Sequence, residues 1–596
     1  MDAHLLNTIA NFIWGIADDC LRDVYVRGKY RDVILPMTVI RRLDAVLEDT
    51  KQQVLDMKKV LDGAGITNQW GALGNAAGQA FCNASPFCLR DLTGRSAGQK
   101  LKTDFEAYLD GFSPNVQEIL EKFKFRNQIA TMVEADILGA VIQKFVSRDI
   151  NLSPRPCGDL PGLDNHAMGT LFEELVRRFN EANNEEAGEH WTPRDVVELM
   201  ADLVFAPIAD QIKDATYSCY DGACGTGGML TVAQDRLNAI AAQSGKKVSI
   251  HLFGQEINPE TYAIAKADMM IRGGDPNNMR FGDTLSEDQF PGFTFQYIIS
   301  NPPFGIDWKR EQKAVEAEAA RGEMGRFAPG LPKISDGQQL FVLNGLAKLA
   351  NKGKMAIIQN GSPLFSGDAG SGPSNIRQYI LENDWLDCII QLSTDMFMNT
   401  GISTYIWVLS KDKPAHRAGK VQLIDASHCF EPRRKSIGTK RNDITDACRE
   451  LIVTAYGEFA NGKVYGDKNG IYCESKVFES VEFGYNKIVV ERPQRDEAGN
   501  VILKRGKPVP DTSLRDTENV PLVQDIDAYF AREVLPYAPD AWIDHSKTKV
   551  GYEIPMTRYF YEYQAPEAVE DIVARITALE QDISAGLAEL FHKEDE

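Results

Sequence analysis

The stretch "YDGACGTGGML", from Tyr220 to Leu230, decides the fold that we expect for this chain. It begins where a β-rich run ends, passes through a glycine-rich turn and opens into the helical pattern "GGMLTVAQDRLNAIAAQ". Strands that alternate with helices in this way indicate a mostly parallel, doubly wound sheet. Glycines in such a turn let the backbone approach a ligand closely, and the start of the next helix accepts a negative group.

The same alternation of short β-rich runs and helices extends over residues 166–412, which we expect to form one α/β domain. The candidate strands are Thr216–Tyr220, Val248–Phe253, Tyr297–Ser300, Lys354–Gln359, Leu386–Leu392 and Thr404–Leu409. In an open sheet of this kind, ligands bind at the carboxyl ends of the strands.

The flanking regions have other patterns. Residues 1–150 carry apolar residues at spacings of three and four, which predicts a helical domain, and 151–165 are typical of a linker. Residues 413–560 are mixed, and we expect 487–517 to be loop. The segment 565–596 predicts a helical tail that packs either on a partner or on this chain's own core. Its apolar stripe consists of Ile572, Ile576, Leu579, Ile583, Leu587 and Leu590.

Composition limits the function. The chain has 596 residues, a net charge of −20 and a pI near 5.0, so it is too long for one core and would repel DNA as a whole. No run approaches the ~20 apolar residues of a membrane span, and the N-terminus lacks the basic region of a signal peptide. Ten cysteines and eight histidines show no metal-ligand spacing. We expect a cytoplasmic protein that has no structural metal and does not associate with a membrane.

The glycine turn fits neither common nucleotide motif. A phosphate-binding Walker loop requires lysine where Gly228 stands, and a dinucleotide fingerprint requires glycine where Leu230 stands. Further along, Glu256 follows a candidate strand, where a carboxylate can accept both hydroxyls of a ribose, and Asn258 before Pro259 is a helix cap. Asp283 in "RFGDTL" follows a third strand, where it can receive an adenine amino group. This ordered set suits S-adenosylmethionine, a nucleoside whose linker carries no phosphate.

The stretch "YIISNPPFG", from Tyr297 to Gly305, ends its strand in a stiff turn because proline cannot donate to a sheet ladder. Methyl transfer to an aromatic amino group is slow because the nitrogen lone pair is delocalised into the ring. The side-chain oxygen of Asn301 and a backbone carbonyl at Pro302 can hold the amine hydrogens and free that lone pair. Phe304 offers a face for a flipped-out base, worth roughly 1–3 kcal/mol.

These motifs, in the order "DGACGTGG", "GQEINPETYAIAKADMMIRGG", "GDTL" and "NPPFG", resemble those of adenine-type DNA methyltransferases. The flanking segments narrow the resemblance to the modification subunit of Type I restriction-modification systems, and they cover most of the chain. They are "MGTLFEELVRRFNE", "GEHWTPRDVVELMADL", "ISDGQQLFVLNGLAKLANKGKMAIIQNGSPLF", "DMFMNTGISTYIWVLSK" and "GYEIPMTRYFYEYQAPEAVEDI". The resemblance implies a Rossmann-like, S-adenosylmethionine-dependent methyltransferase domain with a mixed, mostly parallel sheet, an N-terminal helical domain and a C-terminal helical tail.

The resemblance also implies roles for particular residues. The catalytic motif matches Asn301, Pro302, Pro303 and Phe304. The cofactor-binding positions match Glu189, His190, Trp191, Thr192, Pro193, Arg194, Asp221, Gly225, Thr226, Gly227, Gly228, Glu256 and Asp283, of which the first six touch the methionine end. Two positions depart from the family pattern: Gly222 replaces a usual proline, which we expect to loosen the loop, and Trp191 replaces tyrosine or phenylalanine.

Modification subunits of this kind use a separate specificity subunit to read double-stranded DNA. Two of them usually join one specificity subunit, and a restriction subunit completes the full complex. Acidic composition and the apolar tail fit this division. The basic run "RRKSIGTKR" (433–441) has five Lys or Arg in nine residues and either contacts a phosphate backbone or is a solvated loop.

Three alternatives remain open. The first is a self-sufficient DNA methyltransferase that reads its target through 413–560. The second is a methyltransferase of RNA bases or protein amides, whose nitrogens are similarly deactivated. The third is an inactive scaffold with a methyltransferase fold, which the filled catalytic positions disfavour.

Overall fold

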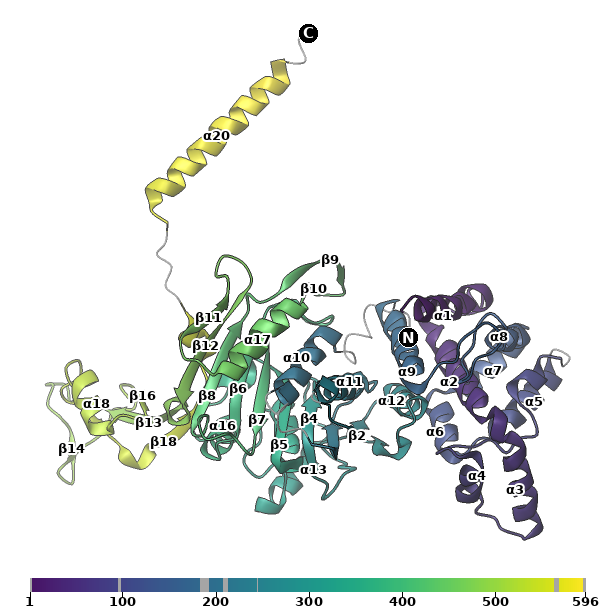
Figure 1. The fold of residues 1–596 in the computed structure, drawn as a ribbon. Coiled ribbons are helices and arrows are strands. Elements are labelled where there is room, and N and C mark those ends of the chain that lie inside the picture. Colours follow the sequence, from purple (N-terminus) through teal and green to yellow (C-terminus); the bar gives the residue numbers. More distant parts are fainter. Residues whose placement is uncertain are drawn as a thin grey trace. The chain divides into compact units, whose positions relative to one another are not determined.

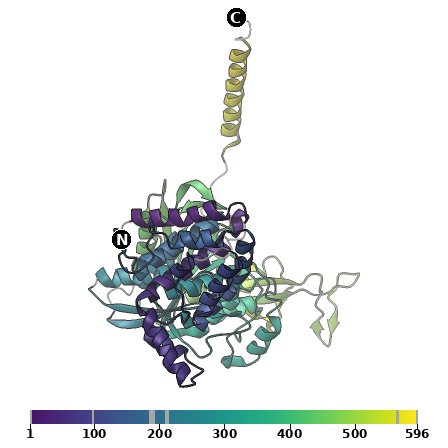
Figure 2. The same ribbon diagram turned by 90° about the vertical axis from the view of Figure 1, so that its right-hand side faces the viewer.

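The computed structural model describes residues 3–94, 98–182, 192–206, 213–243, 245–561 and 567–592 (Figures 1 and 2). The chain divides into two compact units, Met1–Ile554 and Pro555–Glu596. Within the described ranges, every helix falls short of the length and apolarity that a membrane crossing requires.

The N-terminal part of the first unit is helical, as its apolar spacing predicts. Figure 2 shows these helices from the side on which they lie nearest the viewer. They are α1 (Ala3–Ile16), α2 (Arg31–Leu47), α3 (Lys51–Gly63), α4 (Trp70–Ala77), α5 (Gln99–Asp110), α6 (Pro114–Lys122), α7 (Phe125–Glu134) and α8 (Leu138–Phe145).

The segment 151–165, expected as a linker, is bound to this helical core by one buried arginine. Arg42 of α2 donates through Nη1 to the carbonyl oxygens of Leu152 and Leu163, at 2.8 Å each, and through Nη2 to Asn165 Oδ1 at 2.9 Å. Burial lowers the pKa of Arg42 to about 10. Because the guanidinium joins both ends of the segment to α2, the connection has a defined path although it contains no helix or long strand.

A ten-stranded sheet forms the centre of the first unit, in the order β11-β12-β8-β6-β7-β5-β4-β1-β2-β3. The neighbours β5-β4-β1-β2-β3 are parallel and β7 is antiparallel, which confirms a mixed, mostly parallel sheet. All six candidate strands are present, and β3 and three strands beyond residue 412 join them. The bounds are β1 Ala215–Asp221, β2 Val248–Glu256, β3 Met279–Phe281, β4 Phe295–Ser300, β5 Leu349–Asn360, β6 Leu386–Leu392, β7 Thr404–Ser410, β8 Lys420–Ala426, β11 Lys463–Gly466 and β12 Tyr472–Glu479.

Helices cover both faces of this sheet. On one face α10 (Arg194–Phe205), α11 (Gly228–Gln243) and α17 (Asp446–Glu458) share a core with alternate strand residues. Alternation sends the other strand residues to the opposite face, where Ile357 and Trp407 are only 1% exposed. Strands buried on both faces are typical of doubly wound folds, and they explain the near-continuous apolar runs of the sequence.

Helix α12 (Pro259–Ile271) joins the sheet to the N-terminal helices. Its side chains Ala263 and Ile264 belong to the N-terminal core, whereas Ala265 and Met269 belong to the core of the sheet. An ion pair adds to this contact, since Nζ of the buried Lys266 lies 2.6 Å from Oε2 of the more exposed Glu118 of α6. The helix α12 begins three residues after Glu256. Because α12 is packed into both cores, it fixes the position of the Glu256 carboxylate.

The region after β8 combines a hairpin with a small sheet. The hairpin comprises β9 (Glu431–Ile437) and β10 (Lys440–Asp443). The expectation of loop for 487–517 is wrong at both ends, because β13 (Gly484–Glu491) pairs with β16 (Asp516–Pro521) and with β17 and β18. The other elements are β14 Leu503–Lys504, β15 Lys507–Pro508, α18 Ile526–Glu533, β17 Trp542–Ile543 and β18 Lys549–Tyr552.

The second unit contains α19 (Met556–Phe560) and the long helix α20 (Val569–His592), which confirms the expected helical tail. The stripe residues Ile576, Leu579 and Ile583 are each more than half exposed. The side chains of Leu587 and Leu590 lie outside the described part of the chain.

Candidate active site

Four parallel strands end side by side at one edge of the sheet, in the spatial order β4, β1, β2, β3. Asp221 is the last residue of β1 and Glu256 the last of β2, while Asp283 follows β3 and Asn301 follows β4. Parallel strands present their carboxyl ends together, so this edge gathers the polar residues that the sequence places after each strand.

The glycine turn is bonded directly to the acid at the end of β2. The backbone N–H of Gly225 donates to Glu256 Oε2 at 2.8 Å, and the N–H of Asn258 donates to Oε1 at 2.7 Å. Gly225 and Gly227 have φ values of +53° and +83°, a backbone conformation that residues with a side chain rarely adopt. Asn258 caps α12 as expected, since its Oδ1 accepts from Glu260 N and Thr261 N. The turn, the carboxylate and the helix start therefore form one bonded unit.

Gly222, where we expect a looser turn than proline would give, packs closely against its neighbours. Its carbonyl oxygen accepts a hydrogen bond from Thr284 Oγ1, which ties the β1 turn to the segment after β3. An added Cβ would lie only 2.9 Å from the hydroxyl oxygen of Tyr220 and 3.1 Å from Asn344 Nδ2. The absence of a side chain at Gly222 thus lets the side chains of Tyr220 and Asn344 lie close to its backbone.

Asp221 is fully buried behind this turn. It accepts from Ser300 Oγ at 2.6 Å and from the N–H of Ala223 at 3.0 Å, both through Oδ1. Its Oδ2 has no partner among the described residues. Burial raises the pKa of Asp221 to about 7, and the two hydrogen bonds only partly oppose this effect.

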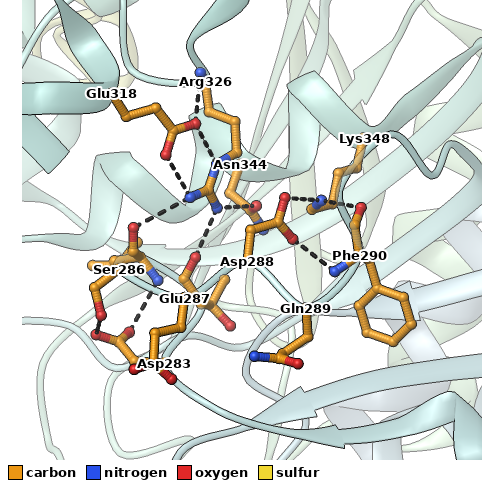
Figure 3. A network of polar contacts seen from close by, with 12 residues as sticks. Asp283, Ser286, Glu287, Asp288, Gln289, Phe290, Glu318, Arg326, Asn344 and Lys348 are labelled. Carbon is orange, nitrogen blue, oxygen red and sulfur yellow. Dashed lines mark hydrogen bonds and ion pairs between the residues drawn. The ribbon is translucent and has the colours of Figure 1, made fainter. Parts of the chain in front are cut away.

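The segment after β3, which carries Asp283, is held by a buried arginine from the insertion between β4 and β5 (Figure 3). Arg326 donates to the carbonyl oxygens of Thr284 at 2.7 Å and Leu285 at 3.2 Å. Its guanidinium forms a two-pronged ion pair with Glu318 of α13 (Gln312–Ala319), at 2.7 Å for each bond. It also donates to Asn344 Oδ1 at 2.9 Å.

A second cation holds the far end of the same segment. Lys348, at the end of α14 (Gln338–Lys348), donates to Asp288 Oδ2 at 2.7 Å and to the carbonyl oxygen of Phe290 at 2.8 Å (Figure 3). Within the segment, Asp283 accepts from the N–H of Leu285 at 2.9 Å and from Ser286 Oγ at 2.7 Å. The carboxylate of Asp283 is thus oriented by its own turn, and the turn is fixed from both sides.

Asn301 has one half of its amide occupied and the other half open. Its Nδ2 donates to Thr192 Oγ1 at 2.9 Å, whereas its Oδ1 is buried and accepts no hydrogen bond from the described residues. A buried amide oxygen without a donor is costly, so such an oxygen indicates a binding position for a donor. Pro302 is buried, Pro303 is exposed, and Phe304 is half-buried against the core of the sheet.

A pocket of about 290 Å³ brings most of the expected residues together. Its lining includes Thr192, Arg194, Gly225, Thr226, Gly228, Glu256, Asp283, Asn301 and Pro303. The lining does not include Pro193, Asp221, Gly227, Pro302 and Phe304, although they adjoin lining residues in sequence. Glu189, His190 and Trp191 lie outside the described residues.

One wall of the pocket comes from α9 (Asn165–Ala182), to which the sequence analysis assigned no role. Phe172, Glu173 and Val176 line it, and Glu173 Oε1 accepts from Arg194 Nη1 at 2.9 Å. The spacing of Phe172 and Val176 by one helical turn, in the family-like segment "MGTLFEELVRRFNE", was the available signal. Trp308, Thr284 and Leu285 were likewise missed as lining residues.

Comparison with known proteins places this fold and site in a family. The model of the N-6 DNA methylase family matches residues 163–497, which is more than half of the chain. The chain belongs to this family. The model of the HsdM N-terminal domain matches residues 9–145, the helical part.

Among curated relatives of this N-6 DNA methylase, the Type I restriction enzyme MjaIX methylase subunit of Methanocaldococcus jannaschii is 26% identical over 296 residues, 50% of each chain. The HindI methylase subunit of Haemophilus influenzae is 28% identical over 264 residues, 44% of this chain and 54% of that one. The chain thus spans about half the length of the curated relatives it matches.

A crystal structure shows the same fold. It is that of the type I restriction-modification system methyltransferase subunit from Streptococcus thermophilus, with a TM-score of 0.59 and 21% identity. The similarity covers 80% of this chain and 97% of that one.

Loss of the Arg326 side chain should loosen the segment that carries Asp283. Arg326→Met leaves two carbonyl oxygens and an amide oxygen without this donor, and Glu318 keeps only the backbone N–H of residue 326, at a cost of roughly 1–3 kcal/mol for each unsatisfied group. We expect amide hydrogen exchange of residues 284–290 to accelerate at least about tenfold. Arg321→Met, at an exposed position of the same insertion, is the matched control. Equal exchange in the two variants would contradict the assignment.

The raised pKa of Asp221 predicts a pH-dependent stability. Because the folded carboxyl titrates near pH 7 and the unfolded one near its ordinary value of 3.8, the folded state holds the extra proton between these limits. The contribution of Asp221 to stability is therefore complete below about pH 4 and is lost as the pH rises to about 7. In Asp221→Asn this slope should disappear from the thermal midpoint measured between pH 5 and 8. An unchanged slope would show that Asp221 is not its source.

Proposed function

We propose that this chain is the catalytic modification subunit of a Type I restriction-modification complex. It methylates the N6 amino group of adenine in double-stranded DNA, at sites that a specificity subunit selects. Family membership and the named relatives support this assignment. The observation that carries the catalytic claim is the buried, unpartnered Oδ1 of Asn301 beside an amide nitrogen that is already bound.

The pocket fits S-adenosylmethionine better than a phosphate-bearing nucleotide. Among the described residues that line it, the one cation is Arg194, and this guanidinium is already bound to Glu173 and Glu198. Glu256 has both oxygens oriented by backbone N–H groups, and each oxygen retains a lone pair for a ribose hydroxyl. A pocket without a free cation favours a ligand whose linker carries no phosphate.

We assign Glu256 to the ribose, Asp283 to the adenine amino group, and the turn at Gly225, Thr226, Gly227 and Gly228 to the body of the cofactor. Asp221 stands behind this turn. The segment Glu189, His190, Trp191, Thr192, Pro193 and Arg194 is assigned to the methionine end. When bound, this cofactor supplies an electrophilic methyl group.

The motif of Asn301, Pro302, Pro303 and Phe304 acts on the target base. Asn301 Oδ1 and the carbonyl oxygen of Pro302 accept the two amino hydrogens of a flipped-out adenine, which withdraws the nitrogen lone pair from the ring. Phe304 provides a stacking face for the base. These groups are preorganised acceptors, so the reaction depends on electrostatics and position and not on a shifted pKa.

We further propose the partners that this role requires: one specificity subunit for two modification subunits, and a restriction subunit in the full complex. The net charge of −20 supports the division, because a chain of this charge gains little nonspecific affinity for DNA. The stripe on α20, with Ile576, Leu579 and Ile583 exposed, supports a helical contact with such a partner.

Product analysis tests the proposal. The full chain is incubated with labelled S-adenosylmethionine and unmethylated DNA, alone and with a candidate specificity subunit, and the nucleosides are separated after digestion. Label in N6-methyladenine only with the partner is the expected result. Label with the chain alone would favour a self-sufficient enzyme that reads DNA through 413–560, and absence of N6-methyladenine in both reactions would overturn the proposal.

The variant Asn301→Ala tests the catalytic residue. It removes the acceptor for the amino hydrogens and leaves the cofactor-binding strand ends in place. We expect kcat to fall at least about 100-fold with the affinity for the cofactor nearly unchanged. Glu256→Gln is the converse control, which should weaken cofactor binding first. Methylation by Asn301→Ala at the wild-type rate would refute the role of Asn301.

A further inference from the structure

The β9–β10 hairpin concentrates exposed positive charge on an acidic chain. Arg434, Lys435 and Arg441 are exposed, and no ion pair joins any of them to a carboxylate among the described residues. Arg433 differs, because it is bound to Asp443 across the hairpin. Three unpaired cations on one hairpin therefore stand out against a net charge of −20.

A buried lysine fixes the second strand of the hairpin, β10. Lys440, only 2% exposed, donates to Asp195 Oδ2 at 2.9 Å and to the carbonyl oxygens of Met396 and Asn442 at 3.2 and 2.7 Å. The N–H of Ile444 donates to the same Asp195 oxygen at 2.8 Å. One carboxylate of α10 thus holds both β10 and the residue that follows it.

The turn of the hairpin is also held in place. The N–H of Thr439 donates to the carbonyl oxygen of Met398 at 2.9 Å, and the N–H of Arg441 donates to that of Asp395 at 2.9 Å. Gly438 has a φ of +56°, and a Cβ there would lie 2.5 Å from the Met398 oxygen. A hairpin anchored at both its turn and its base presents its cations without a large entropy loss on binding.

This anchorage lies next to the catalytic asparagine. Asp195 is three residues from Thr192, whose hydroxyl accepts from Asn301 Nδ2. Three residues span at most roughly 10–11 Å between their Cα atoms, so the backbone of Asp195, whose carboxylate holds the hairpin, lies within about the width of a DNA groove of the backbone of Thr192. A duplex that delivers a base to Asn301 brings its phosphates within the same range.

We infer that the β9–β10 hairpin is a phosphate-contacting arm, in which Arg434, Lys435 and Arg441 hold the DNA backbone beside the flipped base. The inference rests on the proposed function and extends it, since it gives this chain its own contact with DNA beyond the target base. Phosphate contacts position the duplex without reading its sequence. The arm is therefore compatible with a separate specificity subunit.

The test replaces the three cations together, Arg434→Gln, Lys435→Gln and Arg441→Gln, in the full chain bound to its specificity subunit. The matched control replaces Lys504, Arg505 and Lys507 with glutamine on the exposed β14–β15 hairpin, which gives the same change of charge at another hairpin. Binding to a 40-base-pair duplex is measured between about 50 and 250 mM salt.

For the arm variant we expect affinity at about 150 mM salt to fall roughly 10- to 100-fold, and the slope of log K against log salt to decrease by about 2–3. The control variant should keep the wild-type slope. A wild-type slope in the arm variant, or an equal decrease in the control, would overturn the inference.

The affinity for S-adenosylmethionine should be unchanged in both variants, because neither hairpin lines the pocket. Failure of the proposed function has a different signature: the wild-type complex would bind DNA yet form no N6-methyladenine. The salt dependence then still decides whether the hairpin contacts phosphate.

Discussion

The site depends on one constraint, the fixed orientation of a single amide. Asn301 lies at the end of β4, where the prolines stop the strand, and its Nδ2 is bound to Thr192 Oγ1. That bond leaves Oδ1 buried and without a donor among the residues that the structure describes. A rotated amide would present a donor to an amino group that also donates. The hydrogen bond to Thr192 thus holds the amide in the orientation on which the proposed reaction depends.

The rest of the fold holds the neighbouring strand ends, to which we assign the cofactor, in place. Gly225 is bound to Glu256, Glu256 is bound to the start of α12, and α12 packs into two cores. Thr284 ties the segment after β3 to Gly222, and Arg326 fixes the same segment from behind. These contacts join three strand ends before any ligand binds. Preorganisation of this kind lowers the entropic cost of binding and lets fixed dipoles act on the reaction.

Local patterns predicted much of this architecture. The six candidate strands, the N-terminal helices and the cap at Asn258 follow from periodicity and from residue chemistry within a few positions. A strand was expected to end before Asp283, but β3 was given no range among the candidates because three residues cannot show an alternating pattern. The strand β13 lies in a polar segment that was expected to be loop, because its partners β16, β17 and β18 are distant in sequence.

Contacts between residues far apart in the sequence could not be predicted, because no local pattern records them. Nothing near Arg42 indicates that it binds residues 152 and 163, and nothing near Lys440 indicates Asp195, 245 residues away. The run 433–441 was accordingly left open between a phosphate contact and a solvated loop, and the structure shows a hairpin with one buried cation and three exposed ones. Phe172 and Glu173 were given no role, because only the fold brings α9 to the pocket.

The most direct measurement of the central claim is kcat for methyl transfer at saturating cofactor in Thr192→Val, with Thr192→Ser as the matched variant. Valine keeps the shape of threonine but removes the acceptor for Asn301 Nδ2, so the amide loses its fixed orientation. We expect kcat to fall roughly 5- to 13-fold in Thr192→Val and to stay near wild type in Thr192→Ser, since one lost hydrogen bond of about 1–1.5 kcal/mol corresponds to that factor. A valine variant with wild-type kcat would contradict the central claim.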